Sequence, residues 1–381
     1  MRPHRTPMFV SALLLIGLLP GLFPALPAEK LPAQLSDAEF WNLSTTLSEP
    51  DGYFHSNNFV SNERSFQHVL KDLAQAGPGS AYVGVGPEQN FTYMLGVKPR
   101  IAFIVDIRRQ NLLQHLMYKA LFELSADRAD FLSRLLARSR PANLDEKSSV
   151  DTLFESFEKV PANVAIARSS LKAIQERLVL HHGFDLSEDD LLNLERIFWA
   201  FGVGGANLTY DGPVQTPGII TGTGIMPTFG ELMRETDKEG KHQSFLATEE
   251  NFRMIQNLQK KNLVIPVVGN FAGTRALRAV GAYLRERDAT VTAFYTSNVE
   301  QYLFMQDQWR GFYANVTTLP LDKKSVFIRG LIRSASGDLS SSPALPPTSR
   351  YETGLFPITS LVDAYKNDSV RTYHDILIGQ R

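Results

Sequence analysis

Two glycines and two acids, placed around two short apolar runs, are the residues whose spacing most directly predicts chemistry. Gly84, Gly86 and Glu88 follow the first run, and the second, Ile101–Val105, ends at Asp106. Glycines after a strand let the backbone turn sharply towards a ligand, and an acid about 20 residues later accepts hydrogen bonds from ribose hydroxyls. The spacing predicts the first half of a nucleotide-binding βαβ unit, with these four as cofactor-binding residues. The alternative is an ordinary turn, with Asp106 capping the next helix.

Strands followed by helices recur later in the sequence. We predict strands at Leu263–Val268 and Thr290–Tyr295, each followed by a helix. Strand–helix alternation with short connections is typical of a doubly wound, mostly parallel sheet, so the predicted fold class is α/β. Ligands of such sheets bind beyond the carboxyl ends of the strands. We therefore expect Asn270 and Thr296–Asn298 to share a rim with the glycine turn and the aspartate.

Helical periodicity between these regions predicts a helical insertion. Apolar residues recur at spacings of three and four from Leu112 onwards, and Ser187 before three acidic residues is a typical N-cap. We place the insertion at about 107–205 in a single α/β domain spanning 29–381. The glycine-rich stretch at about 201–230 is interpreted as a lid loop or a β-ribbon, with disorder as the competing account.

The segment Tyr53–Glu63 concentrates polar side chains in one predicted loop. It contains three asparagines, two serines, a histidine and two further hydrogen-bonding residues at its ends. Ser61 or Asn62 is expected to cap the helix that carries Phe66. The other asparagines are expected to contribute to the ligand site.

Composition and charge exclude several kinds of site. The chain has 381 residues, with 39 Lys and Arg against 40 Asp and Glu, for a formal net charge of −1. This balance does not predict a nucleic-acid partner. No cysteine is present, which excludes disulfides, a thiol nucleophile and cysteine-ligated metal sites, and we predict no metal site.

The N-terminal residues have the order of a secretory signal peptide. Arg2 and Arg5 precede an apolar run from Met8 to Phe23, which is followed by prolines and Ala28. We therefore expect a signal peptide over residues 1–28, export to the periplasm or beyond, and no membrane span after cleavage. An uncleaved anchor is one alternative, although glycines and prolines leave the run short for a bilayer. A misassigned start is the other.

The stretch Ala81–Pro87, followed by Ile101–Asp106, resembles the first two motifs of class I S-adenosylmethionine-dependent methyltransferases. This resemblance implies a Rossmann-like fold and S-adenosylmethionine as cofactor. It places the two glycines beneath the methionine part of the cofactor and Asp106 on its ribose. Val264–Phe271 loosely resembles the substrate-side motif after that family's fourth strand, which implies a role for Asn270.

The sequence departs from the methyltransferase pattern at two positions. Tyr82 stands where an acid is usual, and Glu88 stands where a third glycine is usual. The chain also resembles an uncharacterised bacterial protein family that carries the same two stretches, Ser56–Glu63 and Ser297–Leu303. That second resemblance implies a fold but no activity.

Two functions remain open from the sequence, and both take a small molecule as partner. The first is an S-adenosylmethionine-dependent methyltransferase or a cofactor-binding relative of one. The second is an exported, non-catalytic binding protein that keeps the fold. For methyl transfer we expect Asn270 or Tyr295 to orient a substrate and Glu300 or His55 to accept a proton, each with a structural role as the alternative. No G-x-S-x-G elbow occurs, although a serine nucleophile is recognised by geometry rather than by motif.

Overall fold

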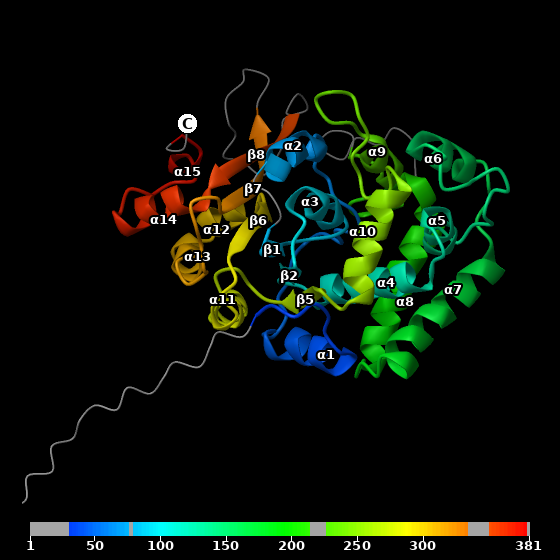
Figure 1. Cartoon of the computed structure of the whole chain (residues 1–381), viewed down its shortest axis with the longest axis horizontal. Helices are drawn as coiled ribbons and strands as arrows, with labels where there is room; N and C mark the ends of the chain where they lie inside the picture. Colours follow the sequence, from blue (N-terminus) through cyan, green and yellow to red (C-terminus); the bar gives the residue numbers. More distant parts are fainter. Residues whose placement is uncertain (1–29, 76–78, 214–225, 334–349, 379–381) are drawn as a thin grey trace, which may run out of the picture.

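The computed structural model describes residues 30–75, 79–213, 226–333 and 350–378, which form an α/β fold around a six-stranded sheet. The strand order is β5-β2-β1-β6-β7-β8, and each neighbouring pair is parallel except β7 and β8 (Figure 1). This mostly parallel sheet confirms the α/β class and is compatible with a Rossmann-like fold. The strands are β1 (Ala81–Gly84), β2 (Ile101–Asp106), β5 (Val264–Val268), β6 (Val291–Ser297), β7 (Val326–Arg333) and β8 (Arg350–Pro357).

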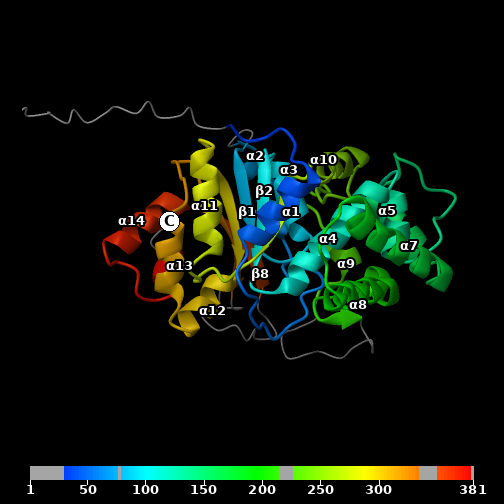
Figure 2. The same cartoon turned by 90° about the horizontal axis from the view of Figure 1, so that it is seen from below.

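The central strands are buried because helices lie on both sides of the sheet. Every residue of β1, β2 and β5 is buried, as expected for parallel strands between helical layers. Figure 2 shows α11, α13 and α14 on one side and α3 and α4 on the other. These helices are α3 (Gln89–Val97), α4 (Arg109–Leu124), α11 (Ala276–Glu286), α13 (Trp309–Val316) and α14 (Ile358–Lys366).

The connection from β2 to β5 contains a second group of helices. Helix α4 packs against β2 and β5, whereas α5, α7 and α8 lie on the side of α4 away from the sheet (Figure 2). Ser187 caps α8 and shares a capping box with Asp190, as the sequence predicts. Arg109 at the start of α4 forms a two-pronged ion pair with Asp190, at 2.5 and 2.7 Å. The group comprises α5 (Arg128–Leu135), α6 (Val150–Glu158), α7 (Val164–Glu176), α8 (Glu188–Gly204), α9 (Phe229–Arg234) and α10 (Glu249–Lys260).

Two local predictions are wrong. Neither Ser61 nor Asn62 caps a helix, because the first turn, Phe66–Val69, is a 3-10 helix that starts after Ser65 and has no side-chain cap. Near the C-terminus, the sequence at residues 373–378 also predicts an edge strand, but Asp375–Ile378 form the short helix α15 instead. The remaining elements are α1 (Asp37–Thr46), α2 (Leu70–Gln75), β3 (Leu208–Thr209), β4 (Gly212–Pro213), α12 (Val299–Met305), α15 (Asp375–Ile378), a π-helix (Arg177–His181) and a 3-10 turn (Gly205–Asn207).

Several predictions fall wholly or partly outside the described residues. The predicted signal peptide lies there, as do residues 214–225 of the glycine-rich stretch. The described beginning of that stretch contains the end of α8, a 3-10 turn and the β3–β4 pair. Among the residues that the structure describes, no helix is both long enough and apolar enough to cross a membrane.

Candidate functional site

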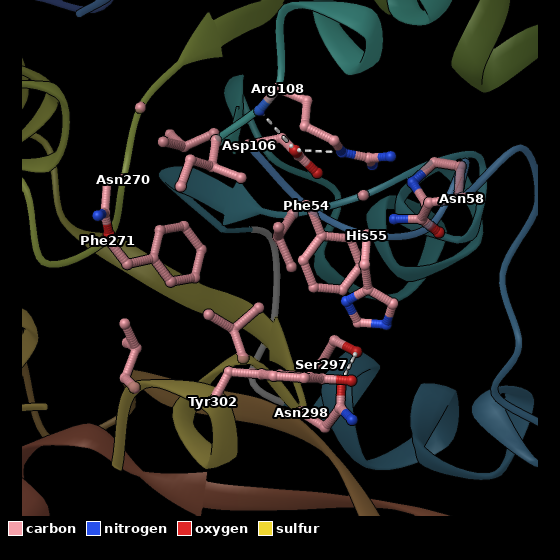
Figure 3. A pocket seen from close by; sticks show the side chains of 18 of the residues that line it. Phe54, His55, Asn58, Asp106, Arg108, Asn270, Phe271, Ser297, Asn298 and Tyr302 are labelled. Carbon is pink, nitrogen blue, oxygen red and sulfur yellow. Dashed lines mark hydrogen bonds and ion pairs between the residues drawn. The ribbon is translucent and has the colours of Figure 1, made fainter. Parts of the chain in front are cut away.

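A cavity of about 270 Å³ lies beyond the carboxyl ends of β1, β2, β5 and β6. This is where an open parallel sheet binds its ligands. Figure 3 shows side chains from these strand ends and from the loop before α2 pointing into one space. The lining includes Val85–Pro87 after β1, Val105–Arg108 at the end of β2, Gly269–Phe271 after β5, and Ser297–Val299 after β6. Of the residues expected to share this rim, Gly86, Asp106, Asn270, Ser297 and Asn298 line the cavity, whereas Thr296 does not.

Gly86 forms the turn after β1 and lines the cavity. Its φ of +73° lies in the left-handed region, which glycine adopts without the steric cost of a Cβ. The buried side chain of Asn90 fixes this turn: Nδ2 donates to the carbonyl oxygens of Val85, Gly86 and Pro87 at 2.9, 3.1 and 2.7 Å. The role of Asn90 was not predicted from the sequence, although the amide group of an asparagine carries N–H donors that can satisfy nearby carbonyl oxygens.

Gly84 is the last residue of β1 and does not line the cavity. A Cβ at this position would overlap the Asn90 side chain and lie 2.8 Å from the Tyr82 ring. The Tyr82 hydroxyl donates to Asn90 Oδ1 at 2.8 Å. The structure therefore accounts for Gly84 and Tyr82 by packing and hydrogen bonding around Asn90.

Asp106 reaches the cavity at the end of β2. Gly84 pairs with Ile104 in the sheet, so Gly86 and Asp106 lie two residues further along their neighbouring strands. The Asp106 Oδ1 atom accepts hydrogen bonds from the backbone N–H and the Nε of Arg108, at 3.0 and 3.3 Å. Helix α4 begins after Arg108, so Asp106 is not its N-cap. Within the described part of the chain, no hydrogen bond is made to Asp106 Oδ2.

Arg108 connects Asp106 to the loop that covers the cavity. Its Nη1 donates to the carbonyl oxygens of Ser56 and Asn57, both at 2.8 Å. Its Nη2 is buried and has no hydrogen-bond partner among the residues that the structure describes. The guanidinium carbon lies 5.6 Å from the centre of the Phe54 ring. Arg108 was not predicted as a site residue, since its signal in the sequence is its position two residues after the aspartate.

Aromatic side chains fill part of the cavity. Figure 3 shows the Phe54 ring between Asp106 and Tyr302. Phe54 lies edge-on to Tyr302, with ring centres 5.6 Å apart, and His55 lies 6.2 Å from Tyr302. Asn57, in the same loop, donates to the backbone oxygen of Asp211 rather than facing a ligand, whereas Asn58 and Asn62 line the cavity. One asparagine of this loop, Asn57, therefore stabilises the fold, and the other two, Asn58 and Asn62, line the cavity as expected.

Glu88 lies behind the cavity wall, which corrects its prediction as a cofactor-site residue. It is fully buried and does not line the cavity. Its Oε1 accepts a hydrogen bond from the backbone N–H of Ser61 at 3.2 Å, and its Oε2 has no hydrogen-bond partner within the described ranges of the chain. Burial raises the pKa of Glu88 to about 7, because the loss of water outweighs the opposing effect of the backbone hydrogen bonds that its carboxylate accepts.

This raised pKa predicts a pH-dependent loss of stability. The folded state binds the Glu88 proton more tightly than the unfolded chain, whose pKa is near 4.5. The stabilisation is therefore complete below pH 4.5 and is lost as the pH rises through about 7. We expect Glu88→Gln to exceed the wild-type stability at pH 8 by about 3 kcal/mol and to be near equal at pH 4.5. Urea unfolding at both pH values measures the difference in stability between Glu88→Gln and the wild type. If that difference were the same at pH 8 and at pH 4.5, the prediction would be contradicted.

Asn270 lines the cavity, but its polar groups are largely used by its own loop. Its backbone N–H donates to Glu49 Oε1 at 2.7 Å, and its Oδ1 accepts from the N–H of Ala272 at 2.9 Å. Asn270 follows the edge strand β5, which is separated from β1 by β2, whereas β6 pairs directly with β1. Ser297 and Asn298 therefore occupy the strand end beside the glycine turn.

Glu300 cannot accept a proton from a ligand in the cavity, because it is buried in an ion pair. Its carboxylate binds Arg329 at 2.5 and 3.0 Å and accepts the Tyr313 hydroxyl at 2.7 Å. Glu300 and Arg329 are almost fully buried and do not line the cavity. Tyr295 and His55, the other residues expected to assist methyl transfer, do line it.

The family model described as a domain of unknown function (DUF7790) matches residues 58–183 and 222–360 of the chain. The two matched ranges contain all six strands of the sheet and most of the cavity lining. No curated protein matches the chain. Among the described residues, no cluster of three or more histidine, aspartate or glutamate side chains is arranged to hold a metal ion.

Proposed function

The chain belongs to the DUF7790 family, a domain of unknown function, and from its cavity we propose that it binds S-adenosylmethionine as a methyltransferase-like protein acting on a small molecule. One observation carries the proposal: the Gly86 turn and the Asp106 carboxylate lie at neighbouring strand ends and line the same cavity. The helices on both sides of the sheet also favour the doubly wound arrangement that such a site requires.

Asp106 offers the acceptor that a ribose needs. Arg108 occupies Oδ1, which leaves Oδ2 to accept a hydrogen bond from a ribose hydroxyl. A carboxylate held rigidly by a neighbouring side chain pays little additional ordering entropy when a ligand binds.

The aromatic lining suits a sulfonium cation. Phe54 and Tyr302 present rings to the cavity, and a cation is attracted to the face of an aromatic ring. Methyl transfer from a sulfonium needs mainly alignment of the acceptor with the methyl group, because the cofactor is already activated. A cavity of about 270 Å³ favours a small molecule as acceptor over a macromolecule.

Calorimetric titration of the purified protein with S-adenosylmethionine and S-adenosylhomocysteine tests the proposal. We expect binding of both, and at least about tenfold weaker binding to Asp106→Ala, since a hydrogen bond to a carboxylate contributes about 1.5 kcal/mol or more. Asp363→Ala is the matched control, because Asp363 is exposed on α14, away from the cavity. Folded protein that binds neither compound would refute the proposal.

The second candidate is an exported, non-catalytic protein that binds another small molecule. Its support is that Arg108 already engages Asp106 and that Glu300, the expected proton acceptor, is locked to Arg329. Export rests on the order of residues 1–28 and is likewise a proposal. Fractionation of cells that express the tagged full chain tests it: a processed product outside the cytosol supports export, and an unprocessed cytosolic product contradicts it.

A further inference from the structure

Two stretches that the sequence analysis singled out, 56–63 and 297–303, meet at the floor of the cavity. The contact is a hydrogen bond from the Ser297 hydroxyl to the Glu63 carboxylate, between residues 234 positions apart in the chain. Ser297 lines the cavity, whereas Glu63 lies behind it. In Figure 3, Ser297 lies on the side of the cavity where the His55 ring projects.

Ser297 has an unusual backbone conformation. Its φ is +53°, in the left-handed region that a serine rarely adopts. The pairing of β6 with β7 shifts register between Tyr295 and Ser297, and α12 starts two residues later. Ser297 thus stands at a sharp strand-to-helix turn that presents its hydroxyl to the cavity. Strained residues of this kind cluster at functional sites, because the surrounding fold must hold them in place.

Glu63 is a buried carboxyl group that lacks a cationic partner. It is 1% exposed, and within the described part of the chain no lysine, arginine or histidine forms an ion pair with it. Gln89 Nε2 donates to its Oε2 at 3.3 Å. Gly330 of β7 provides the space, since a Cβ there would lie 2.5 Å from Glu63 Oε1. A glutamine would make similar hydrogen bonds without the cost of burying an acid.

Burial strengthens Glu63 as a base. Loss of water raises the pKa of its carboxyl group, against the opposing effect of hydrogen bonds from Ser297, Tyr295 and Gln89. The other titratable groups that face it are Tyr82, Tyr93 and Tyr373, and the pKa of each tyrosine around Glu63 is raised above its ordinary value. Glu63 therefore loses its proton at a higher pH than an exposed carboxyl group does.

We propose that Ser297 is a nucleophilic hydroxyl of this cavity, activated by Glu63, and that it attacks the electrophilic carbonyl or phosphoryl centre of a small ligand. In the attack, a bond forms from Ser297 Oγ to the electrophilic atom and the bond to the leaving group breaks. The hydroxyl proton passes to Glu63, which returns it to an alkoxide leaving group; a fluoride leaves without it. This activity does not depend on S-adenosylmethionine, so the two proposals can fail separately.

Diisopropyl fluorophosphate is the probe, because it reacts with base-activated serines and releases fluoride. We expect peptide mass spectrometry to locate the adduct on Ser297 of the full chain. Ser297→Gly should abolish labelling while remaining folded, because glycine accepts the positive φ. Ser169→Ala, at an exposed position on α7, should label at the wild-type rate. Absence of an adduct on Ser297 of folded wild-type protein would overturn the proposal.

The pH dependence of labelling shows whether Glu63 acts as a base towards Ser297 or only stabilises the fold. We expect the wild-type rate to rise as the pH is raised above 4.5, the ordinary pKa of a glutamate, because Glu63 then loses its proton. Glu63→Gln should label about 100-fold more slowly at pH 9, the usual size of a general-base contribution, with a flatter profile. A thermal melting curve checks that this variant is folded. Labelling of folded Glu63→Gln at the wild-type rate would show that Glu63 does not activate Ser297.

Discussion

Replacing Arg329 with methionine is expected to lower the free energy of unfolding by about 4 kcal/mol, the usual cost of leaving one member of a buried ion pair unpaired. Arg329 lies on β7 with its side chain 1% exposed, and its guanidinium group binds both carboxylate oxygens of Glu300. It also lies 4.6 and 4.9 Å from the ring centres of Phe327 and Phe356. Methionine keeps much of this packing. The loss of stability would therefore come mainly from the Glu300 carboxylate, which is left buried without its cationic partner.

The double variant Glu300→Gln with Arg329→Met is the matched control for this prediction. Removing both charges leaves no uncompensated ion in the core, so stability should recover most of the difference. Urea unfolding of the wild type, both single variants and the double variant gives the coupling energy of the pair. If the double variant were no more stable than Arg329→Met, the ion pair would not explain the loss.

Asn90→Ala is expected to lower the free energy of unfolding by about 4 kcal/mol and to abolish ligand binding in the cavity. The Asn90 side chain is the shared partner of the Val85 and Pro87 carbonyl groups and of the Tyr82 hydroxyl. Each buried polar group left without a partner costs about 1–3 kcal/mol. The Gly86 carbonyl would keep a hydrogen bond to His115 Nε2 at 2.9 Å.

The loss of Asn90 is expected to have two effects, a lower stability and, through a change in the glycine turn, a loss of ligand binding. Urea unfolding measures the first effect, and titration with S-adenosylhomocysteine under conditions where the variant is folded measures the second. Asn257→Ala is the control, because Asn257 is exposed on α10 and should change neither. A folded Asn90→Ala protein with wild-type affinity would show that the turn keeps its shape without this side chain.

The apolar runs of the sequence predicted the central strands well. Runs ending at Asp106 and Val268 became buried parallel strands, and the helix predicted around Ser187 starts there, because periodicity and N-caps act over a few neighbouring residues. The β7–β8 pair was missed. β7 pairs in parallel with β6 and antiparallel with β8, and both partners lie beyond the few neighbouring residues that a local sequence pattern reports.

The sequence by itself determined the fold class and brought Gly86, Asp106 and Asn270 to one cavity, because all three follow strands of one parallel sheet. Only the tertiary structure decided the partners of the polar side chains. It placed Glu88 behind the wall and joined Glu300 to Arg329 and Glu63 to Ser297. Strand patterns depend on neighbours along the chain, whereas the charge and reactivity of a side chain depend on burial and on residues hundreds of positions away.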